Sequence, residues 1–390
     1  GNGRPAYGNL ALSVLDEDAV ASAGWTSPEQ FFKTLEDGTD EGHDERTYEV
    51  DQAGGGSVTS ARHTLAPNES KTVTFLVSWY FPNLYNGERG CPGLVGHIYN
   101  NWYGSSADAA GWVAENFDRL YEQTELFRCT YHDTTLPYWL ANRITMPVST
   151  LACDNVKIWE NGRMYAYEGV SFCLGTCGHV HNFAAAAARL FPELERSVRL
   201  QQDLALAFDP ASGRVNFRGA DGTDPEHDWA YASDTQSGYV LLSTTAWPKA
   251  KRQSFENIHD KDDIWTGLEY QAACDMINEG LLQDALVVLK AIDERYDARK
   301  RNPWNEIEGA EHYSRAMHAW NILLALSGYT YDGPAGKIGV APNITPENFK
   351  SFFSGAEGWG SYEQSRTGKR QTSSLHLAYG TLRVGTLAFD

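Results

Sequence analysis

The sequence has few cysteines, few basic residues and no long apolar run. Six cysteines in 390 residues are too few for a fold held together by disulfide bonds. The 32 Lys and Arg residues face 51 Asp and Glu residues, which gives a formal charge of −19. Nucleic acid is therefore not an expected partner, because binding to phosphates needs a basic surface. No run approaches the ~18 apolar residues that a membrane-spanning helix needs.

The same absences bear on where the protein works. Without a transmembrane segment we expect a soluble protein. Anionic lipids attract basic patches, so the acidic charge argues against stable attachment to a lipid surface. Among compartments the cytoplasm is favoured.

Aromatic residues, in contrast, are abundant. The chain contains 12 Trp, 20 Tyr and 16 Phe. Aromatic rings together with carboxylates are a common surface for binding sugars, so the composition fits a carbohydrate ligand. At roughly 150 residues per domain, the length predicts two or three domains, each able to bury its own core.

Hydrophobic periodicity divides the chain into a β-rich part and a helical part. Up to about residue 83, β-branched and aromatic residues between turn residues predict strands at residues 10–15, 47–50, 56–64 and 71–79. From about residue 106 the apolar residues follow helical spacing. This spacing predicts helices at residues 107–124, 136–149, 181–206, 263–279, 281–296 and 310–327.

The helical part alternates helices with short loops that contain Trp, Gly and acidic residues. This alternation is typical of a helical toroid, in which loops at one end carry the function. We therefore predict a β-sandwich-like domain at residues 1–95 and a toroidal domain at residues 96–390. The second domain ends in a β-rich tail at residues 329–390, within which residues 350–354 are a candidate helix.

One segment that could carry catalytic chemistry surrounds Glu168. This residue lies between a Tyr-rich stretch and Gly169, ahead of a loop that leads into a predicted helix. A carboxylate in such a place can be desolvated and directed into a cleft, as a glycosidase nucleophile must be. Taken alone, the pattern also fits an ordinary solvated glutamate in a turn.

Soft metal ligands follow in the same segment. Cys173, Cys177, His179 and His181 offer thiol and imidazole groups, which suit zinc. Their spacing matches no common zinc module, and His179 and His181 point to different sides of a helix start. Free thiols packed near a cleft are the favoured interpretation, and we predict no metal site.

A second such segment covers residues 302–315. Glu306 precedes the predicted helix and Arg315 lies within it, so both side chains could reach one site at the helix N-terminus. Carboxylate and guanidinium groups bind the hydroxyls of sugars, and Trp304 could stack on a sugar ring. The alternative is a helix start with favourable acidic residues and a surface arginine.

Other acidic residues are weaker candidates. Asp133 precedes a Thr-Thr-Leu-Pro stretch and fits a turn or cap residue. Asp234 lies in a Ser-Asp-Thr-Gln-Ser-Gly stretch, which is a candidate site loop. The chain has no P-loop, dinucleotide-binding or zincin motif.

Six strings in the sequence occur in an order found in a known family. They are residues 79–83 (WYFPN), 133–137 (DTTLP), 167–169 (YEG), 175–180 (GTCGHV), 190–195 (LFPELE) and 302–315 (NPWNEIEGAEHYSR). Together they resemble glycoside hydrolase family 116, which includes the non-lysosomal glucosylceramidases and bacterial β-glucosidases and β-xylosidases. The resemblance covers most of the chain from about residue 65 onward.

The resemblance implies an N-terminal β-sandwich packed on an (α/α)6 barrel, and retaining hydrolysis of β-linked glucosides or related sugars. It places Glu168 on the family's nucleophile, and Glu306 and Arg315 on residues that hold the outer hydroxyls of the sugar. His179 falls where some members have an Asp facing the sugar. Trp265 falls near the same subsite.

The chain also departs from the family pattern. The family's general acid lies in an Asn-Thr-Tyr-Asp-like loop, and this sequence has no such loop. Residues 239–259 stand where relatives have several more helices, and Gly309 and Ala310 replace the usual Cys-Gly. The sandwich and the barrel are therefore expected to be incomplete. Either the protein has lost part of the barrel, or the sequence omits stretches of a longer chain.

The leading hypothesis is a retaining exo-β-glycosidase that needs no cofactor. Glu168 is the predicted nucleophile, and Asp234 substitutes for the missing acid. A non-catalytic glycan-binding or scaffold protein derived from such an enzyme is the alternative, with a carbohydrate or glycoconjugate as its ligand. A site supported by a metal at Cys173, Cys177 and His179 is a third possibility.

Overall fold

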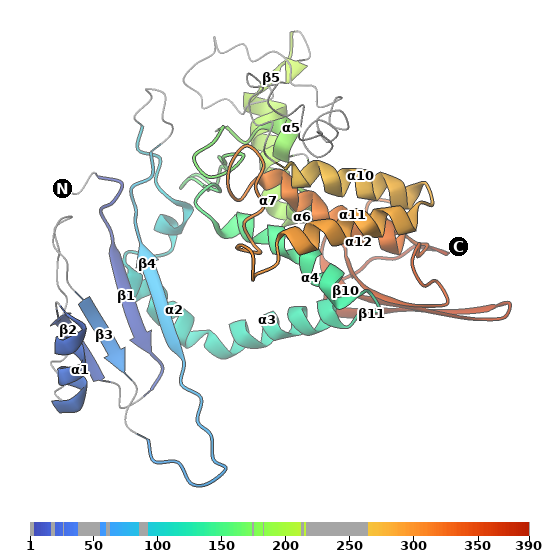
Figure 1. Cartoon of the computed structure of the whole chain (residues 1–390). Coiled ribbons are helices and arrows are strands. Elements are labelled where there is room, and N and C mark those ends of the chain that lie inside the picture. The colour runs from blue at the N-terminus through green and yellow to red at the C-terminus, as the bar shows by residue number, and fades with distance from the viewer. Residues whose placement is uncertain are drawn as a thin grey trace, which may run out of the picture. The chain divides into compact units, whose positions relative to one another are not determined.

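The structure is a computed structural model of the chain (Figure 1). It describes residues 4–16, 20–25, 27–37, 55–59, 63–85, 93–173, 175–181, 183–211, 214–215 and 264–389. The chain forms two compact units. The first comprises Gly1–Tyr85 and Leu94–Glu122, and the second comprises Asn86–Gly93 and Gln123–Asp390.

Two strand pairs form the sheets of the first unit. Strand β1 (Asn9–Val14) pairs antiparallel with β4 (Phe75–Tyr80), and β2 (Val20–Trp25) pairs antiparallel with β3 (Gly55–Thr59). Figure 1 shows β1 and β4 side by side. Three of the four predicted strands are confirmed, although β4 begins four residues later than expected. The fourth, at residues 47–50, lies outside the described residues.

A helix interrupts the part of the chain that we predicted to be entirely β. Helix α1 (Pro28–Asp37) begins with a proline and has Glu29 in its first turn. The Ser27 Oγ accepts a hydrogen bond from the Gln30 backbone N–H at 3.3 Å. These are standard signals of a helix start: a serine cap, a proline at the first position and an early acidic residue. The prediction of β-structure throughout this part was therefore wrong.

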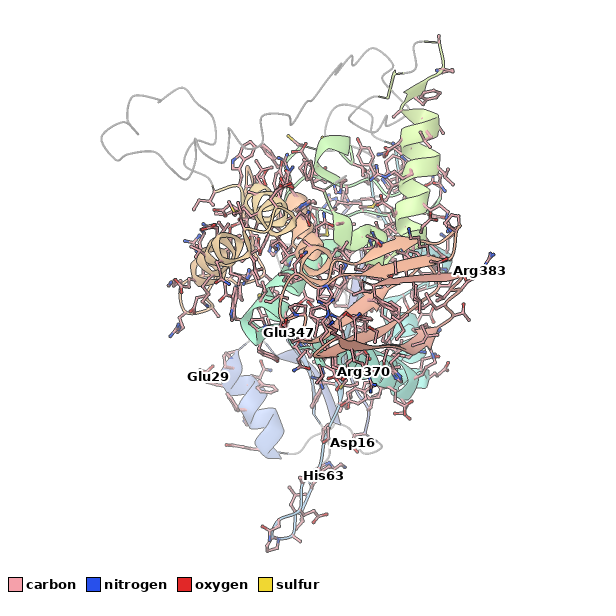
Figure 2. The ribbon with its side chains drawn as sticks, turned by 90° about the vertical axis from the view of Figure 1, so that its right-hand side faces the viewer. Asp16, Glu29, His63, Glu347, Arg370 and Arg383 are labelled. Carbon is pink, nitrogen blue, oxygen red and sulfur yellow. The ribbon has the colours of Figure 1, made fainter. Side chains whose placement is uncertain are left out.

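The loops of the first unit carry a small polar cluster. His63 Nε2 lies 3.0 Å from Asp16 Oδ2, and Lys71 Nζ lies 2.9 Å from the same histidine nitrogen. Figure 2 shows Asp16 and His63 close together. All three groups are at least partly exposed, so their mutual attraction contributes little to stability.

The helix predicted at residues 107–124 is two helices. Helix α2 (Ser106–Glu115) is capped by Ser105, whose hydroxyl accepts a hydrogen bond from the Asp108 backbone N–H at 3.1 Å. Helix α3 (Phe117–His132) follows after a break at Asn116 and extends eight residues further than predicted.

Helices form the core of the second unit. Helix α4 (Tyr138–Thr145), α10 (Thr266–Asn278), α11 (Leu282–Arg295) and α12 (Trp320–Ser327) bury their apolar faces against each other. Figure 1 shows α10, α11 and α12 side by side. The predicted helices at residues 263–279 and 281–296 are confirmed. They are separated by Gly280, whose φ of 80° is a left-handed conformation that glycine adopts without strain.

The long helix predicted at residues 181–206 is broken instead. It consists of α5 (Gly178–His181), α6 (Ala185–Leu190), α7 (Pro192–Ser197) and a π-helix (Val198–Leu206). Pro192 has no N–H to extend α6, which explains one break. The helix predicted at residues 136–149 is also divided. Helix α4 ends at Thr145, and a 3-10 helix follows at Met146–Ala152.

The end of the chain is β-rich, as predicted. Strands β9 (Asn348–Ser354), β10 (Gly358–Thr367) and β11 (Arg370–Gly380) form an antiparallel meander. A second sheet contains β7 (Thr330–Asp332), β8 (Lys337–Val340) and β12 (Thr386–Phe389), with β12 parallel to β8.

The candidate helix at residues 350–354 is wrong, because these residues belong to β9. Phe349, Phe352 and Phe353 are all buried, so both faces of this strand contact other residues. A strand buried on both faces lacks the alternation of apolar and polar residues that identifies strands in a sequence.

The described residues thus form a mixed α/β structure with several small sheets. The helical toroid, which the sequence predicts to be incomplete, stays a prediction, since residues 216–263 lie outside the described part. Within the residues that the structure describes, no helix combines the length and the hydrophobicity that crossing a bilayer requires.

Two positions of α11 test the packing of the core. Leu289 is 0% exposed and Val287 is 69% exposed. We expect Leu289→Ala to lower the free energy of unfolding by about 2–5 kcal/mol, because the cavity adds to the lost burial. Val287→Ala should stay within about 0.5 kcal/mol of the wild type. Urea unfolding of both variants measures this, and equal losses would contradict the assigned helix face.

Candidate active site

The two segments that the sequence singled out lie against each other in the second unit. The Ser314 backbone N–H donates to the Glu168 carbonyl at 2.7 Å, and the Val170 N–H donates to the Glu311 carbonyl at 2.9 Å. A Cβ added to Gly169 would lie 2.9 Å from the Ala310 Cβ. The glycine after Glu168 is therefore required by the close approach of the second segment.

Glu168 is buried, with 3% of its surface exposed. The Tyr313 hydroxyl donates a short hydrogen bond to its Oε2. Burial raises the pKa of Tyr313 well above its usual range, so this phenol stays protonated and remains a donor. This hydrogen bond fixes the orientation of the Glu168 carboxyl.

The loop after Glu168 has an unusual backbone. Ser171, Cys173 and Thr176 have φ values of 54°, 50° and 47°. Each non-glycine residue in this left-handed region costs about 1 kcal/mol or more, and such conformations concentrate at functional sites. Here the loop turns back on itself, so that the Thr176 N–H donates to the Ala166 carbonyl at 2.8 Å.

A buried histidine lies beneath this loop. His181 Nε2 is 3.2 Å from the Tyr167 carbonyl oxygen, and burial lowers the pKa of His181 to about 4. The imidazole is therefore neutral at physiological pH, and Nε2 carries the proton that it donates to the carbonyl.

Glu306 is the centre of a second buried group of charges. Its Oε1 accepts hydrogen bonds from Arg143 Nη1 at 2.8 Å and from the Tyr270 hydroxyl at 2.9 Å. Only 1% of Glu306 is exposed, and this burial raises its pKa to about 7 against the opposing effects of Arg143 and Tyr270.

Arg315 lies in a cage of aromatic rings. Its guanidinium carbon is 5.6 Å from the ring centres of Phe183 and Trp265 and 5.9 Å from that of Tyr313. Its Nη1 is 3.3 Å from Glu308 Oε1, and both side chains are buried. Cation–π contacts with three rings and an ion pair hold the guanidinium in place.

The structure brings some of the predicted site residues together, whereas others lie outside the described residues. Glu168 and the segment bearing Glu306 and Arg315 are brought together, and Trp265 contacts Arg315. Trp304 is 53% exposed. The side chain of His179 and the whole of Asp234 lie outside the described residues.

Sequence reasoning missed three residues of this site, namely Arg143, Tyr270 and Tyr313. Tyr313 lies within the segment at residues 302–315, and its position between Glu306 and Arg315 could have marked it. Arg143 is 1% exposed in a predicted apolar helix, and a lone arginine there was a signal of a buried partner. Tyr270 resembles any other core aromatic residue in the sequence.

The soft ligands do not form a recognisable metal site in the part that is described. Cys177 is fully buried and Cys173 is half-buried. Among the described side chains, no group of three or more His, Cys, Asp or Glu residues could hold a metal ion. Because His179 belongs to the undescribed side chains, the zinc alternative stays a hypothesis.

Comparison with known proteins bears on the N-terminal part. Residues 10–123 match the family model described as beta-glucosidase 2, glycosyl-hydrolase family 116 N-term. The match supports a relationship to glycoside hydrolase family 116 and makes the N-terminal domain of this chain similar to that of the family. No curated protein matches the chain.

Gly267, at the start of α10, tests the packing around Arg315. A Cβ at this position would lie 2.6 Å from the Arg315 Cγ and 2.8 Å from its backbone carbonyl carbon. We expect Gly267→Ala to lower the free energy of unfolding by about 1–3 kcal/mol, since Arg315 must move.

Gly385→Ala is the matched control in the same unit, because its Cβ would meet nothing closer than 3.7 Å. Urea unfolding of both variants compares them. If the two variants are equally stable, Arg315 does not pack against α10 as described.

Proposed function

From the relationship to glycoside hydrolase family 116, we propose that this chain is a retaining β-glycosidase that acts on β-linked glucosides or related sugars. The observation that carries the proposal is the buried Glu168 carboxylate, which accepts a hydrogen bond from Tyr313 beside the segment of Glu306 and Arg315. A desolvated, oriented carboxylate is what nucleophilic attack on an anomeric carbon requires.

In the proposed mechanism Glu168 attacks the anomeric carbon and displaces the aglycone. A second carboxylic acid protonates the leaving oxygen, and as a carboxylate it then activates the water that hydrolyses the glycosyl-enzyme. Retaining enzymes hold two such carboxyls about 5–5.5 Å apart. Asp234 is the proposed acid and base. The reaction needs no cofactor.

Sugar recognition is proposed for the surrounding residues. Glu306 and Arg315 would bind outer hydroxyls, and His179 and Trp265 would lie near the same subsite. Trp304 offers an exposed ring face for stacking. Because Glu168, Glu306 and Arg315 are each at most 3% exposed, a sugar reaches them only when covering side chains move aside.

The rival is a glycan-binding protein without turnover. The observation that favours it is the absence of the family's Asn-Thr-Tyr-Asp-like acid loop from the sequence. Such a protein would use the same Glu306, Arg315 and aromatic residues for binding.

The direct test is hydrolysis of aryl β-glucosides and β-xylosides with activated leaving groups by the purified chain. We expect turnover with retained anomeric configuration. NMR of the first product measures that configuration. Glu168→Gln should lower kcat by at least ~1,000-fold, because the amide cannot form the covalent intermediate.

Glu279→Gln, at an exposed position after α10, is the control and should leave the rate unchanged. Turnover that Glu168→Gln retains would contradict the assignment of the nucleophile. Sugar binding by calorimetry without any turnover would favour the glycan-binding alternative.

Tyr313→Phe removes only the hydroxyl that donates to Glu168. We expect kcat/KM to fall roughly tenfold to a hundredfold, since a hydrogen bond to a charged group contributes about 1.5–3 kcal/mol.

Tyr379→Phe, at a position that is 50% exposed, controls for the loss of a phenol elsewhere. An unchanged kcat/KM in Tyr313→Phe would show that the phenol does not act on the nucleophile.

A further inference from the structure

Arg143 lies on α4 and contacts both the segment at residues 302–315 and the end of α11. It lies in the last turn of α4, and 1% of its side chain is exposed. Its Nη1 donates to Glu306 Oε1 at 2.8 Å and to the Pro303 carbonyl at 3.1 Å. Its guanidinium carbon is 5.5 Å from the ring centre of Tyr296, the residue that follows α11. These contacts fix the guanidinium group and, through it, the carboxylate.

Several charged and titratable groups act on Glu306. Arg143 does so from α4 and Tyr270 from α10, while Arg295 ends α11 and Tyr296 follows it. Arg295 is engaged elsewhere, because its two Nη atoms donate to Glu269 at 2.6 and 3.0 Å. Among the described residues, Arg143 is thus the cation in direct contact with Glu306.

Two further charges modulate Arg143 from α11. Asp293 Oδ1 lies 3.9 Å from Arg143 Nε, and Lys290 Nζ pairs with the other oxygen of Asp293 at 2.7 Å. The long Asp293 contact and its own lysine partner leave the short bond to Glu306 as the principal ion pair of Arg143. Removing one partner from such a buried pair is strongly destabilising, because it leaves the other charge buried without compensation.

The two oxygens of the Glu306 carboxylate have different surroundings. Both donors, Arg143 and Tyr270, bind Oε1. Oε2 is buried and accepts no hydrogen bond from the described residues. A buried acceptor without a donor is unfavourable, and a ligand hydroxyl that donates to Oε2 would recover that free energy.

We propose that Arg143 is a positioning residue of the glycoside site. By holding Oε1 it favours the ionised form of the Glu306 carboxyl and leaves Oε2 as the acceptor for one hydroxyl of the bound sugar. Arg143 does not touch the sugar and acts only through Glu306. This inference rests on the proposed function for its ligand, whereas its effect on the charge of Glu306 is independent of turnover.

The first experiment follows the titration of Glu306 itself. Carboxyl carbon-13 NMR of the full chain with labelled glutamate reports it, and the Glu306→Gln variant assigns the signal. In the wild type burial raises the pKa of Glu306 to about 7. In Arg143→Met the cation is absent, so the carboxylate is less stable and the titration midpoint moves to higher pH.

Tyr270→Phe tests the same idea with a smaller change. It removes one hydroxyl and keeps the ring that fills the core, so it guards against a failure of Arg143→Met to fold. Its midpoint should also move to higher pH. Arg301→Met is the matched control, because Arg301 stacks on the same Tyr296 ring at 5.6 Å from an exposed position. An unmoved midpoint in Tyr270→Phe and in folded Arg143→Met overturns the inference.

The second experiment asks whether the effect reaches the sugar. We expect Arg143→Met to lower kcat/KM on an aryl β-glycoside by roughly tenfold to a hundredfold, as for the loss of a charged hydrogen bond. Glycosides that each lack one sugar hydroxyl identify the hydroxyl that Glu306 binds, because Glu306→Gln hydrolyses the matching deoxy-glycoside as fast as the wild type does. On that deoxy-glycoside we expect Arg143→Met to lower kcat/KM by less than about threefold. A purely structural role predicts the same loss on every deoxy-glycoside, and that result overturns the proposal.

The pH profile gives a further readout. The ionised Glu306 is lost as the pH falls through its titration midpoint, so the acidic limb of kcat/KM should move to higher pH in Arg143→Met. If the wild type hydrolyses no glycoside, the proposed function fails. The NMR titration then decides the inference alone, because a moved midpoint supports the role of Arg143 on Glu306 and an unmoved one overturns it.

Discussion

The backbone pairing between residues 168–170 and residues 311–314 is the constraint on which the candidate site depends. Two short hydrogen bonds join segments that are far apart in the sequence, and Gly169 allows the close approach. Because Tyr313 belongs to the paired stretch, its hydroxyl reaches Glu168, while Glu306 and Arg315 flank that stretch on either side.

The cost of this arrangement is the burial of charge. Arg143 with Glu306, Arg295 with Glu269 and Arg315 with Glu308 are ion pairs with little exposure in the second unit. Buried ion pairs are weak contributors to stability, since desolvation offsets the attraction. Their concentration in the second unit therefore fits a site that recognises a polar ligand better than a core selected for stability.

The sequence predicted helices well where the apolar period was regular, as in α10 and α11. It failed where local chemistry overrode the period, as in α1 with its Ser27 cap and at Pro192, and where burial on both faces hid a strand, as in β9. Both segments of the candidate site were predicted from their residue types. Their pairing and the roles of Arg143 and Tyr270 could not be, because these depend on tertiary contacts between α4, α10 and the 302–315 segment.

The most direct measurement is covalent trapping with an activated 2-deoxy-2-fluoro-β-glucoside, which slows hydrolysis of a glycosyl-enzyme more than its formation. Mass spectrometry of the digested chain then locates the label. The account predicts one fluoroglycosyl group on the peptide that contains Glu168, with no label in Glu168→Gln. A label on another carboxylate, or turnover of the reagent without any labelled peptide, would contradict Glu168 as the nucleophile.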